Sequence, residues 1–469
     1  MKTAAGDEAE VTPRRGQGNE RQFSPRFVTP LFMGSALNPV NSSVIATALV
    51  YIAASMHVPV GRTAILISSL YLASAIAQPT AGRLAEEFGP RRVFLVGIVI
   101  VLAGGIVGGL AENLPTLVLA RILIGIGTSA GYPSAMLLIR RRATALGLTS
   151  PPSTILGGLA ITSAVTLAIG PTVGGLLIGW FNWRAAFLIN VPVAVLAFTM
   201  ALLWIAKDAG QARGRSVRDL AARVDLAGIA AFGTAITALL IFLISLPALD
   251  AVALACAAAA AAGLVVIELR APNPFIDFRL LASNGALTRT YVRYCLTLLG
   301  IYVILYGLTQ WIEAGRGLTA YQAGLALIPM GLLSATTARV VSRSPRLRPS
   351  LIVSALALIA GAAGVFFLTS HSPLIAIIGV TALFGLVAGF GNVTNQTALY
   401  KEAPPEKVGT AAGLLRTFGY IGSIAAATIT GIAFRVRVDD GGLHRIAAAL
   451  AAIGIVVLLM SVLDRQLTE

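Results

Sequence analysis

The sequence predicts an all-α membrane protein with about fourteen transmembrane helices. Of its 469 residues, 57% are hydrophobic and only 12% are charged, which leaves too few charges to cover the surface of a soluble protein of this length. Apolar runs long enough to cross a hydrocarbon core of ~30 Å as helices recur from residue 27 almost to the C-terminus. The alternating apolar and polar strands of an outer-membrane barrel are absent, so the helical interpretation is favoured.

The expected spans are the apolar runs between charged or turn-rich breaks. They cover residues 27–52, 63–83, 93–111, 115–139, 155–180, 184–206, 226–246, 248–268, 288–312, 322–342, 348–369, 374–398, 409–434 and 443–463. The run at 248–268 is the weakest, because its alanines are only mildly apolar. The basic stretch after residue 206 leads into two apolar runs joined by a break without Lys or Arg. This pattern predicts an inserted transmembrane hairpin and favours fourteen spans over twelve.

The net charge of +15 resides mainly in short segments between apolar runs, on alternate sides of the expected membrane. This asymmetry fits the positive-inside rule with both termini cytoplasmic, and it predicts a multi-pass protein of the plasma (inner) membrane without a nucleic-acid partner. One loop, 435–445, carries arginines on the predicted outer side. Residues 1–26 are polar and lack the apolar stretch of a cleavable signal peptide, so they are expected to form a disordered cytoplasmic tail.

No pattern of residues predicts a metal site, a cofactor or an enzyme. Cys256 and Cys295 fall in or beside apolar runs, and the three histidines are dispersed. An embedded enzyme needs a paired acid and base, a metal cluster or an activated nucleophile, and no HExxH, GxSxG or GxxxxGK pattern is present. A receptor or sensor, the alternative of the same class, would normally append a signalling domain.

The loop after the second span carries a charged, glycine-bounded motif at residues 82–94. Its glycines permit close packing and a tight turn, and its charges suit a cytoplasmic latch; these residues are Gly82, Glu86, Gly89, Arg91 and Arg92. The motif resembles the loop 2–3 signature of the major facilitator superfamily, with Glu86 in place of the usual Asp. It departs from that signature at Glu87 and Pro90, where basic residues are more common.

Arg121 lies inside the fourth span, where a charged residue is costly and usually faces the protein interior. The alternative is an arginine that snorkels to the membrane edge. The surrounding residues resemble the span-four motif of the superfamily, in which this arginine is associated with proton transfer.

The fifth span contains glycines that allow helices to approach closely and a proline that bends the helix, namely Gly170, Pro171, Gly174 and Gly175. This stretch resembles the antiporter motif of the superfamily. The pattern that follows, Trp183, Arg184, Phe187, Asn190 and Pro192, looks like the fourteen-span drug:proton antiporter branch.

An internal repeat supports the same fold, because residues 338–351 align with 82–95 and again precede an apolar run. The resemblance implies a major facilitator fold of two pseudo-symmetric six-helix bundles, at 27–206 and 288–469. The basic loop and the inserted hairpin would then occupy 207–287.

Polar side chains at helical spacing are the candidates for a substrate cavity between the bundles. They are Asn38 and Asn41 in span one, Tyr71 and Gln78 in span two, Tyr302, Tyr306 and Gln310 in span nine, and Asn392, Asn395 and Gln396 in span twelve. Uncharged amides and aromatic rings suit an amphipathic ligand. The alternative is that these side chains join helices to one another.

The expected acid of span one is missing, because Asn38 stands where the drug:proton branch usually carries Asp. A proton carrier must change its protonation state, which an amide cannot do. Glu313, at the outer end of span nine, and Glu86 are the acids that can substitute. Arg121 and Arg416 stay protonated, so their expected role is to bias a neighbouring acid or to bind an anion.

The sequence therefore predicts a secondary transporter that works by alternating access, without enzymatic activity. The resemblance implies export of drug-like or amphipathic organic compounds, with proton exchange as an open question. The alternatives are an uncoupled facilitator and a proton-coupled importer of a small metabolite. Expected partners are a small-molecule substrate, protons and the lipid bilayer, and the chain is expected to be a monomer.

Overall fold

The computed structural model describes residues 23–148, 152–208, 225–245, 250–272, 274, 276–342, 346–403 and 408–464. Every regular element within these ranges is a helix, which confirms the all-α prediction. Of the predicted tail at 1–26, residues 1–22 lie outside the described residues. The first helix begins at Pro25. Most of the basic stretch after residue 208 also lies outside them.

The helices follow the predicted apolar runs closely. The first group is α2 (Pro25–Val44), η1 (Ile45–Thr47), α3 (Leu49–Ser55), η2 (Val60–Thr63), α4 (Ala64–Phe88), α5 (Pro90–Gly109), α6 (Leu114–Ser129), α7 (Gly131–Ala145), α8 (Ser153–Trp180), α9 (Ala185–Leu188) and α10 (Asn190–Trp204). Next come α12 (Leu226–Ser245), α13 (Ala251–Arg270) and α14 (Phe278–Ser283). The last group is α15 (Gly285–Val303), η3 (Ile304–Leu308), η4 (Trp311–Gly315), α16 (Ala320–Ala326), α17 (Ile328–Val341), α18 (Leu347–Phe367), α19 (Leu374–Glu402), α20 (Val408–Ala433) and α21 (Asp440–Leu463).

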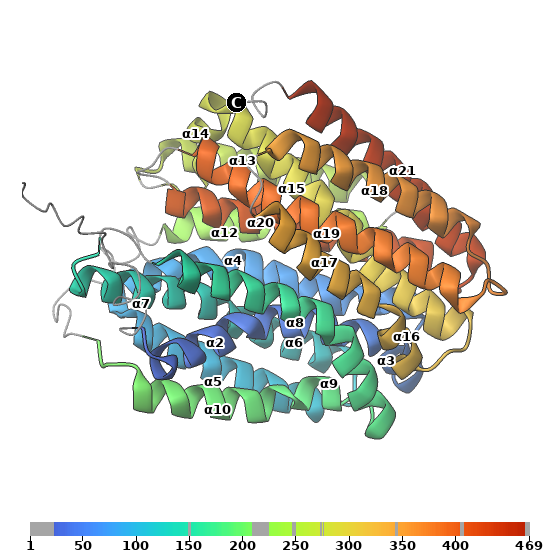
Figure 1. Ribbon diagram of the computed structural model, residues 1–469, viewed down its shortest axis with the longest axis horizontal. Coiled ribbons are helices and arrows are strands. Elements are labelled where there is room, and N and C mark those ends of the chain that lie inside the picture. Colours follow the sequence, from blue (N-terminus) through green and yellow to red (C-terminus); the bar gives the residue numbers. More distant parts are fainter. Residues whose placement is uncertain are drawn as a thin grey trace, which may run out of the picture.

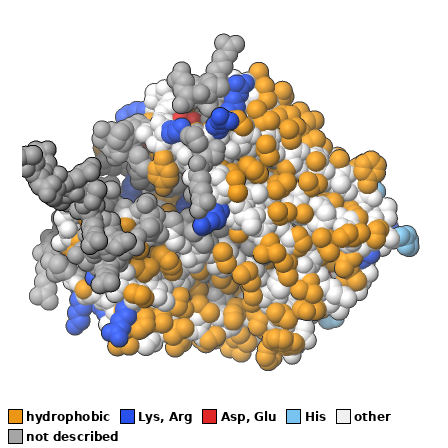
Figure 2. All heavy atoms as spheres, in the orientation of Figure 1, with side chains coloured by type: hydrophobic (Ala, Val, Ile, Leu, Met, Phe, Trp, Pro, Cys, Tyr) orange, Lys and Arg blue, Asp and Glu red, His pale blue; other side chains and the backbone are white. Residues whose placement is uncertain are grey.

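Eleven helical spans among the described residues are long and apolar enough to cross a membrane. A bent pair at the start of the chain, Pro25–Thr47 and Leu49–Ser55, makes up to twelve. Two further apolar helices, Val165–Trp180 and Leu226–Phe242, are shorter, so the count of fourteen stays a prediction. Hydrophobic side chains cover most of the visible face, and Lys and Arg gather toward its left end (Figure 2).

The helices α2–α10 and α15–α21 form two layers, one below the other in Figure 1. Helices α12 and α13 pack against each other, and α12 also contacts α4 from the first group and α20 from the second. The boundaries predicted for the two bundles and the hairpin stay a prediction. We call the end of the molecule where α2 begins and α21 ends the terminal end, and the opposite end the distal end.

Span nine is a single long helix, Gly285–Gly315, that changes its winding partway along. Two of its segments, η3 and η4, are π-helical. Such wide turns inside a helix occur often at functional sites. Residues 297–313 of the span are all buried between other helices, so their side chains project toward protein and not toward lipid.

The two layers meet backbone to backbone at the distal end. A Cβ atom added at Gly61 would lie 2.6 Å from the carbonyl oxygen of Gly431, and one at Gly324 would lie 2.6 Å from that of Pro171. Gly175 is equally crowded by the backbone of Ala320 and the next residue. The absence of side chains at these glycines lets η2 (Val60–Thr63) approach α20 and lets α8 approach α16, which closes the distal end.

Candidate functional site

A cluster of tyrosines lies where the two layers meet in the middle of the molecule. The hydroxyls of Tyr71 (α4) and Tyr306 (η3) lie 3.0 Å apart, and Tyr306 donates to the carbonyl oxygen of Ser42 at 3.0 Å. The Tyr302 ring stacks on that of Tyr306, with centroids 5.7 Å apart. Tyr420 (α20) packs against Tyr71 and donates a hydrogen bond to Gln78. Four of the predicted cavity residues therefore meet here.

Arg121 (α6) is fully buried beside this cluster, with 1% of its surface exposed. Its Nε donates to the carbonyl oxygen of Leu66 at 2.9 Å, and its Nη1 donates to that of Asn41 at 3.0 Å. Its Nη2 is buried without a hydrogen-bond partner in the described part of the chain. Burial this deep excludes the snorkelling alternative for Arg121.

The break in span one explains why backbone carbonyls receive these donors. Helix α2 ends at Val44 and the chain continues as a 3-10 turn, with a bend of 59° before α3. The last carbonyls of an α-helix lack partners within the helix. Those of Asn41 and Ser42, which are consecutive, accept from Arg121 and Tyr306 instead. The bend thus places the guanidinium and the tyrosine hydroxyls side by side.

The two asparagines of span one connect helices of the same layer. The amide of Asn38 donates to the hydroxyls of Ser74 at 3.1 Å and Thr128 at 3.0 Å. Asn41 forms a reciprocal amide pair with Asn190 (α10), at 2.6 and 2.9 Å. In this conformation the side chain of Asn41 is engaged in helix packing, whereas Asn38 is partly exposed.

Glu313, in the second π-helical segment, is buried with 5% of its surface exposed. Both of its carboxyl oxygens are buried without a hydrogen-bond partner in the described residues. Gln310 lies one turn earlier, and its carbonyl oxygen Oε1 is also buried and without a partner there. Tyr302, Tyr306, Gln310 and Glu313 follow one another at helical spacing along span nine.

Of the remaining candidates, Arg416 (α20) lies between the layers, with its guanidinium carbon 3.6 Å from the ring centroid of Tyr132 (α7). Asn392 is half-buried and Gln396 is exposed. Asn395 is fully buried and accepts from Arg293 Nε at 2.8 Å. It is thereby part of a network within one layer, away from the tyrosines.

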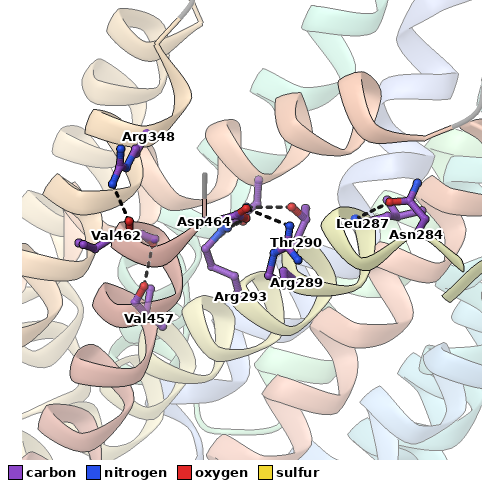
Figure 3. A network of polar contacts seen from close by, with 11 residues as sticks. Asn284, Leu287, Arg289, Thr290, Arg293, Arg348, Val457, Val462 and Asp464 are labelled. Carbon is purple, nitrogen blue, oxygen red and sulfur yellow. Dashed lines mark hydrogen bonds and ion pairs between the residues drawn. The ribbon is translucent and has the colours of Figure 1, made fainter. Parts of the chain in front are cut away.

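Arg293 (α15) organises that network at the terminal end. It also donates to Thr290 at 2.8 Å and lies 3.4 Å from Asp464, which receives Arg289 at 3.0 Å. Figure 3 shows both arginines of α15 reaching toward Asp464, just beyond the end of α21. This network joins the ends of spans nine, twelve and fourteen.

A second polar network at the terminal end involves the motif at 82–94. The carboxylate of Asp208 accepts from the backbone N–H groups of Arg91 and Arg92 at 3.3 and 3.0 Å, and lies 3.7 Å from Arg141. Gly89, with φ of +100°, leaves the space into which Asp208 fits. Glu86, the acid that the sequence favours for this latch, is exposed. The structure therefore shows Asp208 as the acid that contacts the start of α5.

Sequence reasoning missed Tyr420, Asp208 and Arg293. Tyr420 lies one turn after Arg416, so helical spacing from a charged residue was a signal for it. Arg293 lies inside the predicted span 288–312, as Arg121 lies in its own. Asp208 carried no local signal, since the backbone N–H groups that it accepts from, those of Arg91 and Arg92, precede it by more than a hundred residues. No group of three or more metal-ligating side chains occurs among the described residues.

A stack of long apolar helices around buried, uncharged and cationic polar groups defines a multi-pass membrane transporter. The chain belongs to the Major Facilitator Superfamily, whose family model matches residues 31–427. It is 33% identical to the "Uncharacterized MFS-type transporter YwoD" of Bacillus subtilis, over 93% of this chain and 96% of that protein.

Two further similarities concern a curated protein and a solved structure. The chain is 27% identical to the methylenomycin A resistance protein of Streptomyces coelicolor, over 92% of this chain and 90% of that protein. The crystal structure of the peptide transporter POT superposes with a TM-score of 0.67 at 15% identity, covering 97% of this chain and 98% of that one. The structural similarity shows the fold alone. These findings confirm the predicted fold and the prediction that the protein is a transporter and not an enzyme.

Proposed function

We propose that the protein exports amphipathic organic compounds by alternating access, in exchange for protons carried by Glu313. The terminal end would face the cytoplasm of a plasma membrane, as the positive-inside rule predicts. Export is favoured because the methylenomycin A relative is named a resistance protein. A monomer remains the expected state, since each chain provides a complete interface between two layers.

The burial of Glu313 is the observation that carries the proton-exchange proposal. A carboxylate without a donor is costly to bury, so we expect Glu313 to hold a proton while the distal end is closed. For exchange, the proton enters from the outer side while the distal end is open, and it leaves toward the cytoplasm when a solute binds in the conformation that is closed at the distal end. No acid is needed at Asn38 for this cycle.

The contacts between the layers support alternation between two conformations. The distal end is joined by glycine contacts, and the centre by the Tyr71–Tyr306 hydroxyl pair, the Tyr306-to-carbonyl bond and the hydrogen bond from Tyr420 to Gln78. None of these contacts involves an ion pair, so they can separate without exposing paired charges to the membrane. The networks around Asp208 and Asp464 lie within single layers and would move with them.

Proteoliposomes with a pH-sensitive dye inside test the proposal. Ethidium, chloramphenicol and naphthalenesulfonate serve as cationic, neutral and anionic solutes, and a solute gradient should drive a pH change in the wild type. The Glu313→Gln variant should still exchange labelled solute across the membrane but move no protons. Glu112→Gln is the matched control, since Glu112 is exposed at the distal end.

Two results would contradict the proposal. Solute movement without any pH change in the wild type would identify an uncoupled facilitator. Retained proton movement in Glu313→Gln would show that another group carries the proton.

A further inference from the structure

The charge of Arg121 has no counter-ion in the described part of the chain. Its guanidinium contacts two backbone carbonyls, and no carboxylate lies within ion-pair distance. Burying an uncompensated charge is costly, and charged groups inside membrane spans usually mark a functional path. Asn38 and Asn41, the cavity candidates of span one, are neutral amides, so they supply no counter-charge either.

The hydroxyl groups of Tyr71 and Tyr306, beside Arg121, both act as hydrogen-bond donors. The proton of Tyr306 points to the carbonyl oxygen of Ser42, so the proton of Tyr71 must point to the oxygen of Tyr306. When the two layers separate at this level, both hydroxyl protons lose their acceptors. Together with Nη2 of Arg121, which lacks a partner already, three donor groups of this cluster are then without acceptors.

The wider surroundings are also unfavourable to a positive charge. Arg416 is a second cation between the layers, and it contacts the Tyr132 ring and no carboxylate in the described residues. Glu313 lies seven residues beyond Tyr306 on the same span. It is expected to be neutral under the proposed function.

We propose that this site selects aromatic ligands through an oxygen acceptor, either anionic or carbonyl, and rejects permanent cations. The acceptor oxygen binds Nη2 of Arg121 and the hydroxyls of Tyr71 and Tyr306, while the ligand ring stacks on Tyr302. This inference deepens the proposed function, on which it rests, by naming the substrate class.

Binding to the purified protein in detergent tests the inference without any transport. The probes share one ring system: naphthalenesulfonate, naphthyl methyl ketone and naphthylmethyl-trimethylammonium, each titrated by calorimetry. We expect the sulfonate to bind at least about tenfold more tightly than the cation, because like charges repel across a low-dielectric site. The ketone should bind more tightly than the cation as well.

Substitutions separate recognition by Arg121 from a structural role. Arg121→Gln should bring the sulfonate and the cation to within about threefold of each other, whereas the exposed Arg62→Gln should leave their ratio unchanged. Tyr306→Phe, which keeps the ring, should weaken the sulfonate and the ketone by roughly threefold to tenfold and spare the cation. A merely structural Arg121 would shift all three probes together.

Several outcomes overturn the inference. These are equal binding of sulfonate and cation by the wild type, no binding of any probe, and a preference that survives Arg121→Gln. The binding preference for oxygen acceptors and the proton exchange are tested by separate measurements, so one can be refuted without the other. A clear preference for oxygen acceptors without solute-driven pH change would refute only the antiport proposal, and the reverse would refute only the site.

Discussion

The close approach of α8 to α16 makes Gly175 the most informative position for testing distal closure. A Cβ atom at Gly175 would lie 2.9 Å from the carbonyl carbon of Ala320 and 3.0 Å from Cα of Tyr321, and closer still to the Ala320 carbonyl oxygen. All three are backbone atoms, so no side chain can rotate away. We expect Gly175→Ala to oppose closure of the distal end.

The size of the effect follows from the overlap. Ordinary contact at a Cβ atom begins at 3.4 Å, and the contact with the Ala320 carbonyl oxygen falls short of that by about 1 Å, so α8 and α16 would have to move apart. Overpacking of this kind costs about 1–3 kcal/mol. The hydrogen bond from Thr172 Oγ1 to the Gly324 carbonyl, at 3.1 Å, would also weaken. The population closed at the distal end should fall about 5- to 150-fold relative to the open one.

Distances between spin labels at the distal end measure this shift. Labels at Ser55→Cys and His371→Cys lie on exposed positions of different layers, in a background where Cys256 and Cys295 are replaced by serine. The wild type should show one short distance, and Gly175→Ala a second, longer one.

Gly179→Ala, one turn later in α8, is the matched control. A Cβ atom at Gly179 meets nothing within 4 Å, and the gain in helix propensity is the same at both glycines. Equal distance distributions in Gly175→Ala and the wild type would refute the reasoning. So would an equal shift in Gly179→Ala.

Three further substitutions test the other polar groups. Gly89→Ala should lower thermal stability in detergent by about 1–3 kcal/mol, since φ is +100° and the new Cβ would lie 2.7 Å from Cβ of Asp208; unchanged stability would contradict the latch. Arg293→Met should cost about 3–5 kcal/mol in the same assay, because it leaves the buried Asp464 without one of its two arginines. Asn38→Asp adds an acid within reach of two hydroxyls, and should raise the protons exchanged per solute; an unchanged ratio in proteoliposomes would show that the carboxylate does not titrate.

The sequence predicted the spans well because the membrane imposes a local requirement. A run such as 374–398 must be apolar and helical wherever it packs, so composition alone located α19. The break in span one was not foreseen, since Pro39 lies before it and α2 continues past that proline to Val44. Helix ends shifted by a few residues, as at α21, which begins at Asp440.

The site was harder to predict, because it depends on which helices meet. Tyr71 and Tyr306 are separated by more than two hundred residues, and no spacing rule connects them. Asn395 is an amide one turn after Asn392, another cavity candidate, but its side chain accepts a hydrogen bond from Arg293 and lies in a different network. The latch could also be predicted only in part. The motif at 82–94 contains Gly89 and the start of α5, but the acid that contacts them is Asp208, after the end of α10.

Ligand binding and proton transfer are assigned here to different residues, Arg121 and Glu313, whereas an acid in span one would bring both to one site. An Asp at position 38 would place the proton carrier on the same span as the carbonyl that Arg121 contacts, so ligand and proton would act at one site. With the neutral Asn38 at that position, Arg121 is left to bind a ligand oxygen, and the buried acid lies on another span, at Glu313. Under the proposed function, ligand and proton are then coupled through the separation of the layers around span nine. Substrates would be selected by their oxygen acceptors and not by positive charge.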